Sequence, residues 1–150
     1  ADARSWIYGK GEELYSTVYN ANCEYIAGFL RDPSTIPNIA IFNLIKSKKY
    51  NAYIEQEKDA KDIFEKHAKG IEGWHVMKRK GMVVNSEGAW DMVTIDLFDN
   101  WEKANQNWWS EIPRNVMKKH NEKHGSDLRE IRHRVMTGLL FDARTEKKED

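Results

Sequence analysis

The chain has 150 residues, about the usual size of one domain, and this length can bury a core without disulfide or metal staples. Lys+Arg and Asp+Glu both total 24, so the formal net charge is zero, and this balance argues against a nucleic-acid partner, because phosphate binding needs a basic surplus on one face. No apolar run approaches the roughly 20 residues that a membrane span needs, which argues against a membrane partner.

The first 37 residues are expected to form a helical extension ahead of the core domain. Leu14, Val18, Tyr25 and Phe29 recur at spacings of four and seven, which is typical of one face of a helix. Pro33 would end this helix, since proline disfavours helix in the residue before it. A strand is the alternative, because several residues of the segment favour β-structure: Tyr15, Thr17, Val18 and Tyr19.

The sequence is compatible with more than one cellular compartment. Cys23 is the single cysteine, so an intramolecular disulfide is excluded, but a lone thiol fits any compartment. The sequence begins Ala1-Asp2-Ala3 without Met, as a mature chain does after signal-peptide cleavage and as a trimmed chain also does. Export and the cytoplasm are therefore both retained as expectations.

Residues 38–144 are predicted to form one α+β domain, followed by a charged, solvated tail at 145–150. The first strand is apolar on both faces apart from Asn38 and Asn43, as a buried central strand is. The first helix carries one apolar face, and Gly70 follows it where a helix C-terminal glycine belongs. The expected elements are strand 38–45, helix 50–69, strand 71–84, turn 85–88, strand 89–98, a helical segment with Asn100 as N-cap, helix 113–123 ended by Gly125, a helical turn over 127–131 and strand 133–144.

The order of these elements predicts the fold class. A βαββαβ order is typical of the ferredoxin-like arrangement, an α+β fold in which two helices cover one face of a small antiparallel sheet. Such a layer often needs a second copy of itself to cover its bare face. The pattern therefore predicts a homodimer as well as a fold.

This order and spacing resemble the dimeric α+β barrel superfamily, which includes antibiotic-biosynthesis and heme-degrading monooxygenases, stress-responsive barrel proteins and muconolactone isomerases. The resemblance covers about residues 38–144 and lies in the architecture, with hardly any sequence identity. It implies a homodimer in which two sheets form one barrel, with a ligand cavity between each sheet and its own helices. The candidate ligand-binding residues for such a cavity are Trp74, Phe98, Trp108, Trp109 and His120.

The heme-degrading branch can be compared residue by residue. Asn43 matches its asparagine on the first strand, and His120 lies in about the right part of the second helix for its heme ligand, although Pro113 shifts the phase of that helix. Phe98 stands where that branch has a tryptophan late on the third strand. The resemblance therefore leaves heme binding open, whereas heme breakdown is not expected and no other cofactor is implied.

Three polar residues on the strands are the candidate catalytic groups: His75, Asn43 and Asp96. His75 follows Trp74 on a central strand and could act as a general base near neutral pH; the alternative places its ring at the sheet edge or the dimer seam. Asp91 and Asp96 have an odd spacing and fall on opposite faces of their strand, so one of them points inward and could pair with His75. Asn43 needs a partner, because burying its amide unpaired costs a few kcal/mol.

Two further pairs admit both a structural and a binding role. Trp108 and Trp109 would point about 100° apart on a helix, so one of them is available to a ligand. His120 and His124 have the i, i+4 spacing of zinc sites. A third ligand would be needed, which His133 or Asp96 could supply only if the fold brings it near. The last turn of a helix also favours histidine for dipole reasons, so no metal is expected.

A basic group lies near the start of the last strand. Its members are Arg129, Arg132, His133 and Arg134. A solvated sheet edge explains these charges, and anion capture near the mouth of the pocket is the alternative.

No stretch carries a catalytic signature, so the expected function follows from the pocket. The protein is expected to bind a small hydrophobic or aromatic ligand. As an enzyme it would be a cofactor-independent monooxygenase or isomerase acting on a small aromatic or polyketide-like substrate, which Asn43 orients and His75 deprotonates with the support of Asp96. The alternatives are a stress-type or ligand-binding protein without chemistry, and a heme-binding protein that uses His120.

Overall fold

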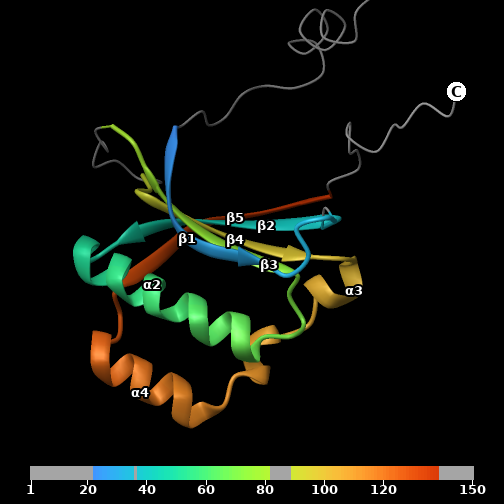
Figure 1. The fold of residues 1–150 in the computed structure, drawn as a ribbon. Helices are drawn as coiled ribbons and strands as arrows, with labels where there is room; N and C mark the ends of the chain where they lie inside the picture. Colours follow the sequence, from blue (N-terminus) through green and yellow to red (C-terminus); the bar gives the residue numbers. More distant parts are fainter. Residues whose placement is uncertain (1–21, 36, 82–88, 139–150) are drawn as a thin grey trace, which may run out of the picture.

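The computed structural model describes residues 22–35, 37–81 and 89–138, which form a mixed α+β fold with a five-stranded antiparallel sheet (Figure 1). The strand order is β1-β3-β4-β2-β5. The elements in chain order are β1 (Cys23–Leu30), β2 (Ile39–Ser47), α2 (Tyr50–His67), β3 (Gly73–Arg79), β4 (Met92–Phe98), α3 (Trp101–Ala104), the 3₁₀ helix η1 (Trp108–Glu111), α4 (Arg114–His124) and β5 (Arg129–Gly138). The predicted α+β class with an antiparallel sheet is confirmed, and the order of β2 to β5 is compatible with a ferredoxin-like arrangement.

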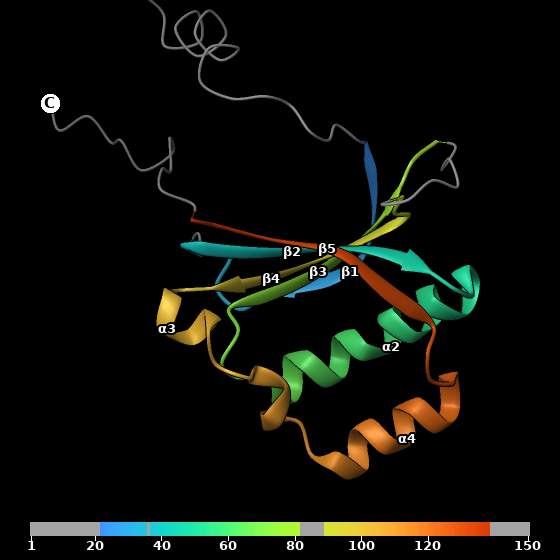
Figure 2. The ribbon, with the colours of Figure 1, turned by 180° about the vertical axis from the view of Figure 1, so that it is seen from behind.

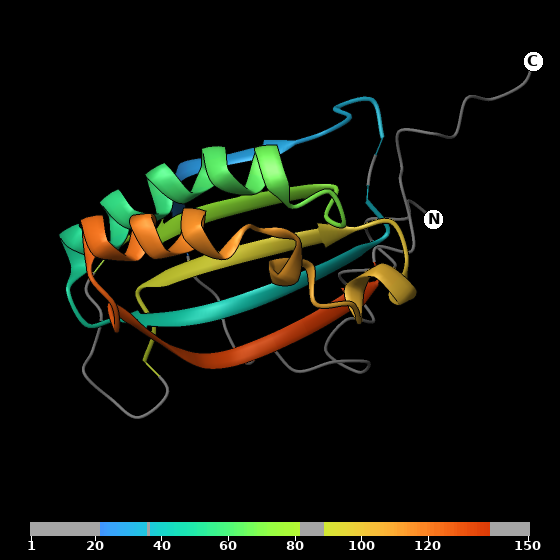
Figure 3. The same cartoon turned by 90° about the horizontal axis from the view of Figure 1, so that it is seen from below.

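Helices α2 and α4 lie on the same face of the sheet (Figure 3). Seen from behind, both again lie on one side, and no helix of the described residues lies on the other (Figure 2). The main core fills the space between the sheet and these helices. At its centre the Phe64 ring packs edge-on against Trp74 and Trp108, with ring centroids 5.1 and 5.2 Å apart. The helix layer therefore provides both the core and the cavity described below.

The predicted helical extension is wrong over residues 23–30, which form the edge strand β1 instead. This strand pairs antiparallel with β3 and has a bulge between Tyr25 and Ala27. Spacings of four fit a strand face as well as a helix face, and the hydrogen bonds offered by the edge of β3 decide between them. The end of β1 is tied to α2 by Arg31, whose guanidinium donates to the Ala68 carbonyl oxygen at 2.7 Å. The part of the extension before residue 22 lies outside the described residues.

Strand β5 begins earlier than predicted, and β3 (Gly73–Arg79) and β4 (Met92–Phe98) are shorter than the expected 71–84 and 89–98. A helical turn was expected over 127–131, but β5 already begins at Arg129, where it pairs with Ser47 of β2. Asp127 adopts a positive φ of 61°, which turns the chain out of α4 and into the strand. The turn at 85–88 and the strand ends at 82–84 and 139–144 lie outside the described residues.

The helix termini follow the sequence signals closely. Helix α2 spans Tyr50–His67, against an expected 50–69, and its buried face consists of Tyr53, Glu57, Ala60 and Phe64. The Asn100 side chain accepts a hydrogen bond from the Lys103 backbone N–H at 2.9 Å, as an N-cap does. Gly125 ends α4 with a φ of +94°, a conformation that glycine adopts without strain.

The face of the sheet away from the helices carries a second, smaller apolar cluster. Leu44, Trp90 and Val93 are its buried members, and Phe42 and Ile95 pack against them. The strands thus carry apolar side chains on both faces, as predicted for β2.

Within the described residues, none of the helices is long and apolar enough to span a bilayer.

Candidate functional site

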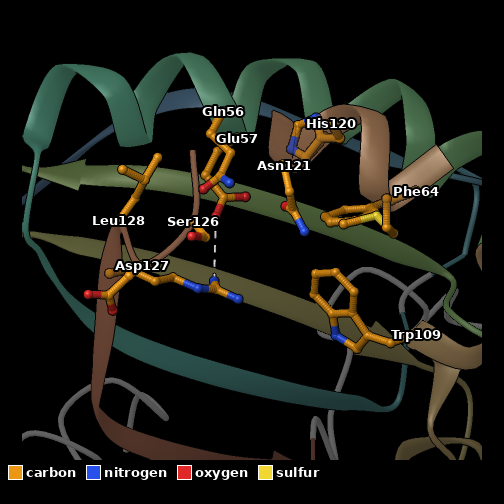
Figure 4. A pocket seen from close by; sticks show the side chains of 12 residues that line it. Gln56, Glu57, Phe64, Trp109, His120, Asn121, Ser126, Asp127 and Leu128 are labelled. Carbon is orange, nitrogen blue, oxygen red and sulfur yellow. Dashed lines mark hydrogen bonds and ion pairs between the residues drawn. The ribbon is translucent and has the colours of Figure 1, made fainter. Parts of the chain in front are cut away.

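A cavity of about 470 Å³ lies between α2, α4 and the start of β5 (Figure 4). Phe64 of α2 and Trp109 of η1 form its aromatic wall, with ring centroids 4.9 Å apart. Met117 and Leu128 add apolar surface, and Asn121 points into the same space. This volume is within the range of small-molecule sites, roughly 300–1,000 Å³.

The polar end of the site lies against the sheet. A second space of about 30 Å³ shares four lining residues with the larger cavity, namely Glu57, Phe64, Trp109 and Arg129. Asn43 of β2 and Asp96 of β4 also line it. A space of this size holds about one water molecule or one small polar group of a ligand.

Asn43 and Asp96 form a buried hydrogen-bonded pair across β2 and β4. The Asn43 amide nitrogen donates to Asp96 Oδ2 at 3.2 Å and to the Thr94 hydroxyl at 3.1 Å. Its carbonyl oxygen accepts from Nε of Arg134 at 2.7 Å. All hydrogen-bonding atoms of the Asn43 amide group are therefore directed at side chains of the site, so the expectation that this residue needs partners is met.

The carboxyl group of Asp96 has a raised pKa. Burial raises its pKa from 3.8 to about 6, because charge is unfavourable where only 9% of the residue is exposed. The hydrogen bond from Asn43 and the positive charges of Arg129 and Arg134 oppose this rise, and the charge of Glu57 adds to it. A carboxyl group with a pKa near 6 can both give and accept a proton at physiological pH.

A second buried carboxylate, Glu57, faces the same space from α2. It is 4% exposed, and burial raises its pKa, against the charge of Arg129. Arg129 Nη1 lies 3.4 Å from Glu57 Oε1, the ion pair marked in Figure 4, and it donates to the Tyr53 hydroxyl at 3.2 Å. This arrangement explains how a carboxylate is accommodated in the apolar face of α2.

His75 lies on the opposite face of the sheet from Asp96, so the expected pair does not form. In the register of β3 and β4, Trp74 is opposite Asp96 and His75 is opposite Ile95. The His75 ring lies 5.9 Å from that of Tyr25, burial lowers its pKa, and its buried Nδ1 makes no hydrogen bond within the described residues. Asp91 is not its partner either, because the Asp91 carboxylate accepts from the backbone N–H and the hydroxyl of Ser47.

The predicted ligand-binding residues are divided between cavity and core. Trp109 lines both spaces, and Trp74 lines the smaller one. Phe98 is fully buried and Trp108 is 6% exposed; neither lines these two spaces. His120 lines the larger cavity from α4. Burial lowers its pKa, and the charge of His124 lowers it further.

The two histidines of α4 contact each other and the neighbouring helix α2. Their rings lie 4.9 Å apart, and His124 Nε2 contacts Asp59 Oδ2 of α2 at 2.7 Å. In residues 22–35, 37–81 and 89–138, no group of three or more His, Cys, Asp or Glu side chains could hold a metal ion. The His124–Asp59 contact instead joins the two helices that enclose the cavity.

Sequence reasoning missed Glu57 as a site residue, although its position carried a signal. It stands among Tyr53, Ala60 and Phe64, at spacings of four and three, in the apolar face of α2. A charged residue inside such a stripe must find a buried partner. Arg129 and Arg134 were singled out as a basic group, and the structure places both at the small polar space.

Comparisons with protein-family models, with curated proteins and with solved structures find no match for this chain.

Proposed function

We propose that this protein binds a small aromatic ligand in the cavity between α2, α4 and the sheet, and that Asp96 transfers a proton to or from it. The single observation that supports this proposal is the buried Asn43–Asp96 pair at the polar end of an aromatic-lined cavity. Asn43 orients the carboxyl group, and the pKa near 6 suits general acid–base catalysis. The reaction class is that of a cofactor-independent isomerase or oxygenase, whose first step moves a proton of the substrate.

In this proposal Asp96 takes the role that His75 had in the sequence-based hypothesis. The structure places His75 on the far face of the sheet, where it cannot reach the cavity. Phe64 and Trp109 would stack on the ligand ring, because aromatic walls bury apolar surface at a low entropic cost. The fold proposed for this site is a ferredoxin-like barrel subunit, which the strand order supports.

The proposal is tested with a neutral aromatic probe, N-phenyl-1-naphthylamine, added to the full chain and followed by its fluorescence. Replacing Trp109 with Ala should weaken binding about tenfold or more, since it removes one wall of the cavity. Trp101→Ala is the matched control, because Trp101 is exposed to a similar extent, 49% against 39%, and lines neither space. Equal affinities in both variants, or no binding by the wild type, would show that the cavity is not the site.

Heme is the second candidate ligand, because His120 lines the same cavity. A histidine nitrogen is a common axial ligand of heme iron. Added hemin should then give a Soret band that is lost in His120→Ala. An unchanged band in that variant would remove His120 from the site.

We also propose that two subunits pair through the sheet face opposite the helices. The apolar cluster on that face supports the pairing, since Phe42, Met77 and Ile95 are only partly buried in one subunit. Two such sheets would form a barrel with one helix-side cavity in each subunit.

A further inference from the structure

The proposed function leaves one charged group at the site without a role. Arg134 of β5 reaches the small polar space and donates from Nε to Asn43. Within the described residues, its two terminal nitrogens make no hydrogen bond and no ion pair. A guanidinium group that lines a cavity, is held by one nitrogen and has two others without a partner is suited to a bidentate ligand.

Arg129, the first residue of β5, lines the same space. It is the ion-pair partner of Glu57, and it also contributes to the electrostatic field at Asp96. Both arginines therefore act on the Asp96 carboxyl group, from one strand. The space between them, about 30 Å³, admits one small polar group and no ring.

The charges at this end balance without a ligand. Arg129 and Arg134 contribute two positive charges, and Glu57 and Asp96 contribute two negative charges when both are ionised. A ligand anion would leave one negative charge in excess, in a place where desolvation makes unpaired charge costly. Protonation of one carboxylate restores the balance, and Asp96 is the group to take the proton because Glu57 is already paired with Arg129.

We propose that the polar end binds the carboxylate of an aromatic acid between Arg129 and Arg134, and that Asp96 binds a proton when this ligand enters. The inference rests on the proposed function, because the larger cavity would hold the ring of the acid. The protonated Asp96 donates a hydrogen bond to the bound carboxylate. The protonated Asp96 is then the acid in the proposed proton transfer.

The other groups around Asp96 do not supply this proton. Asn43 of β2, Thr94 of β4 and Trp74 of β3 carry no charge there. From α2, Glu57 and Tyr53 bind Arg129; from α4, His120 faces the larger cavity, and burial lowers its pKa. The pKa of Asp96, about 6, places its titration within an accessible pH range.

The inference is tested by isothermal titration calorimetry of the full chain with two probes of the same shape, 2-naphthoate and 2-naphthamide. At pH 5.5 the acid should bind about tenfold or more tightly than the amide, since only the acid pairs with the guanidinium groups. Its affinity should fall as the pH rises from 5.5 to 8, approaching tenfold per pH unit above about 6, whereas amide binding stays constant.

Two variants identify the groups responsible. Arg134→Gln should abolish the preference for the acid, and Arg132→Gln should keep it, because Arg132 lies on the same strand but pairs with Glu130 outside the cavity. Arg134→Gln removes the hydrogen bond to Asn43, so the variant is checked by urea unfolding, where a cooperative transition shows that it is still folded. Asp96→Asn should bind the acid with an affinity that no longer depends on pH.

The outcomes separate the two proposals. If the amide binds as tightly as the acid and Trp109→Ala weakens both, the acid class is wrong and the cavity stands. If the acid is preferred but Arg134→Gln keeps that preference, the carboxylate lies elsewhere and the inference is overturned. If neither probe binds, the proposed function fails together with the inference.

Discussion

Asp96 has its carboxyl group buried on the helix side of β4, and this position carries a cost in the folded protein. Asn43 bonds to one of its oxygens, and the two guanidinium groups of β5 offset only part of the desolvation. Groups that destabilise a fold in this way are concentrated at functional sites. The energetic consequence can be measured without knowing any ligand.

The free energy of unfolding should fall as pH rises from about 4 to about 6, through Asp96. Its pKa is raised from 3.8 to about 6 on folding, so the folded state binds the proton more tightly than the unfolded chain in this range. Stability decreases with pH wherever the folded state holds more protons. The penalty is absent below the unfolded pKa and complete above the folded one, at about 3 kcal/mol for two pKa units.

Urea unfolding of the wild type and Asp96→Asn at pH 4 and pH 7.5 measures this effect. The asparagine variant should be more stable than the wild type at pH 7.5, by up to about 3 kcal/mol, and similar at pH 4. Asp62→Asn, at an exposed position of α2, is the matched control. A variant that is less stable than the wild type at both pH values would show that the carboxylate is a net stabilising group.

At the scale of elements, β1 depends on a close approach to β3. Gly28 pairs with His75, and a Cβ at this position would overlap His75 Nδ1 and the Trp74 carbonyl oxygen. The backbone of Trp74 cannot move without displacing the ring that packs against Phe64. Glycine is therefore required at the contact between the added edge strand and the rest of the sheet.

Gly28→Ala should lower the free energy of unfolding by about 1–3 kcal/mol, as overpacking in a rigid region does. Gly70→Ala is the comparison, because its Cβ would meet the end of the Glu111 side chain, which can shift at the cost of the hydrogen bond that it accepts from the Gly70 backbone N–H. The urea midpoints of the two variants give the difference. Equal losses would indicate that the β1–β3 contact adjusts as easily as a surface side chain.

At the scale of the whole molecule, the two faces of the sheet have different roles. The helix side carries the main core and the cavity, whereas the other side carries the cluster of Leu44, Trp90 and Val93. Polar site residues and apolar pairing residues alternate along the same strands. The proposed dimer would therefore leave both cavities accessible.

The wild type should be a dimer by light scattering, and Ile95→Lys should be a monomer that stays folded. A lysine at the centre of the proposed interface would place a charge between two apolar sheets. Tyr50→Lys changes a partly exposed aromatic residue on the helix side and should remain dimeric. A monomeric wild type would exclude the barrel pairing while leaving the cavity of one subunit unaffected.

Sequence alone determined the features whose causes are local. One apolar face predicted α2 to within two residues, although its C-cap is Ala68 and not the expected Gly70. Asn100 and Gly125 marked a helix start and a helix end. Asn43 was predicted to need a partner because its strand is otherwise apolar. Each of these inferences uses only neighbours within a few residues, where backbone geometry fixes which side chains share a face.

Tertiary structure alone decided which side chains meet. Residues 23–30 became a strand because an edge of β3 was available, and Glu57 is paired with Arg129, 72 positions later. The separation of His75 from Asp96 follows from the register of β3 and β4. A shift of one residue in that register moves every side chain to the other face, and register depends on the packing of the whole sheet, which no local pattern contains.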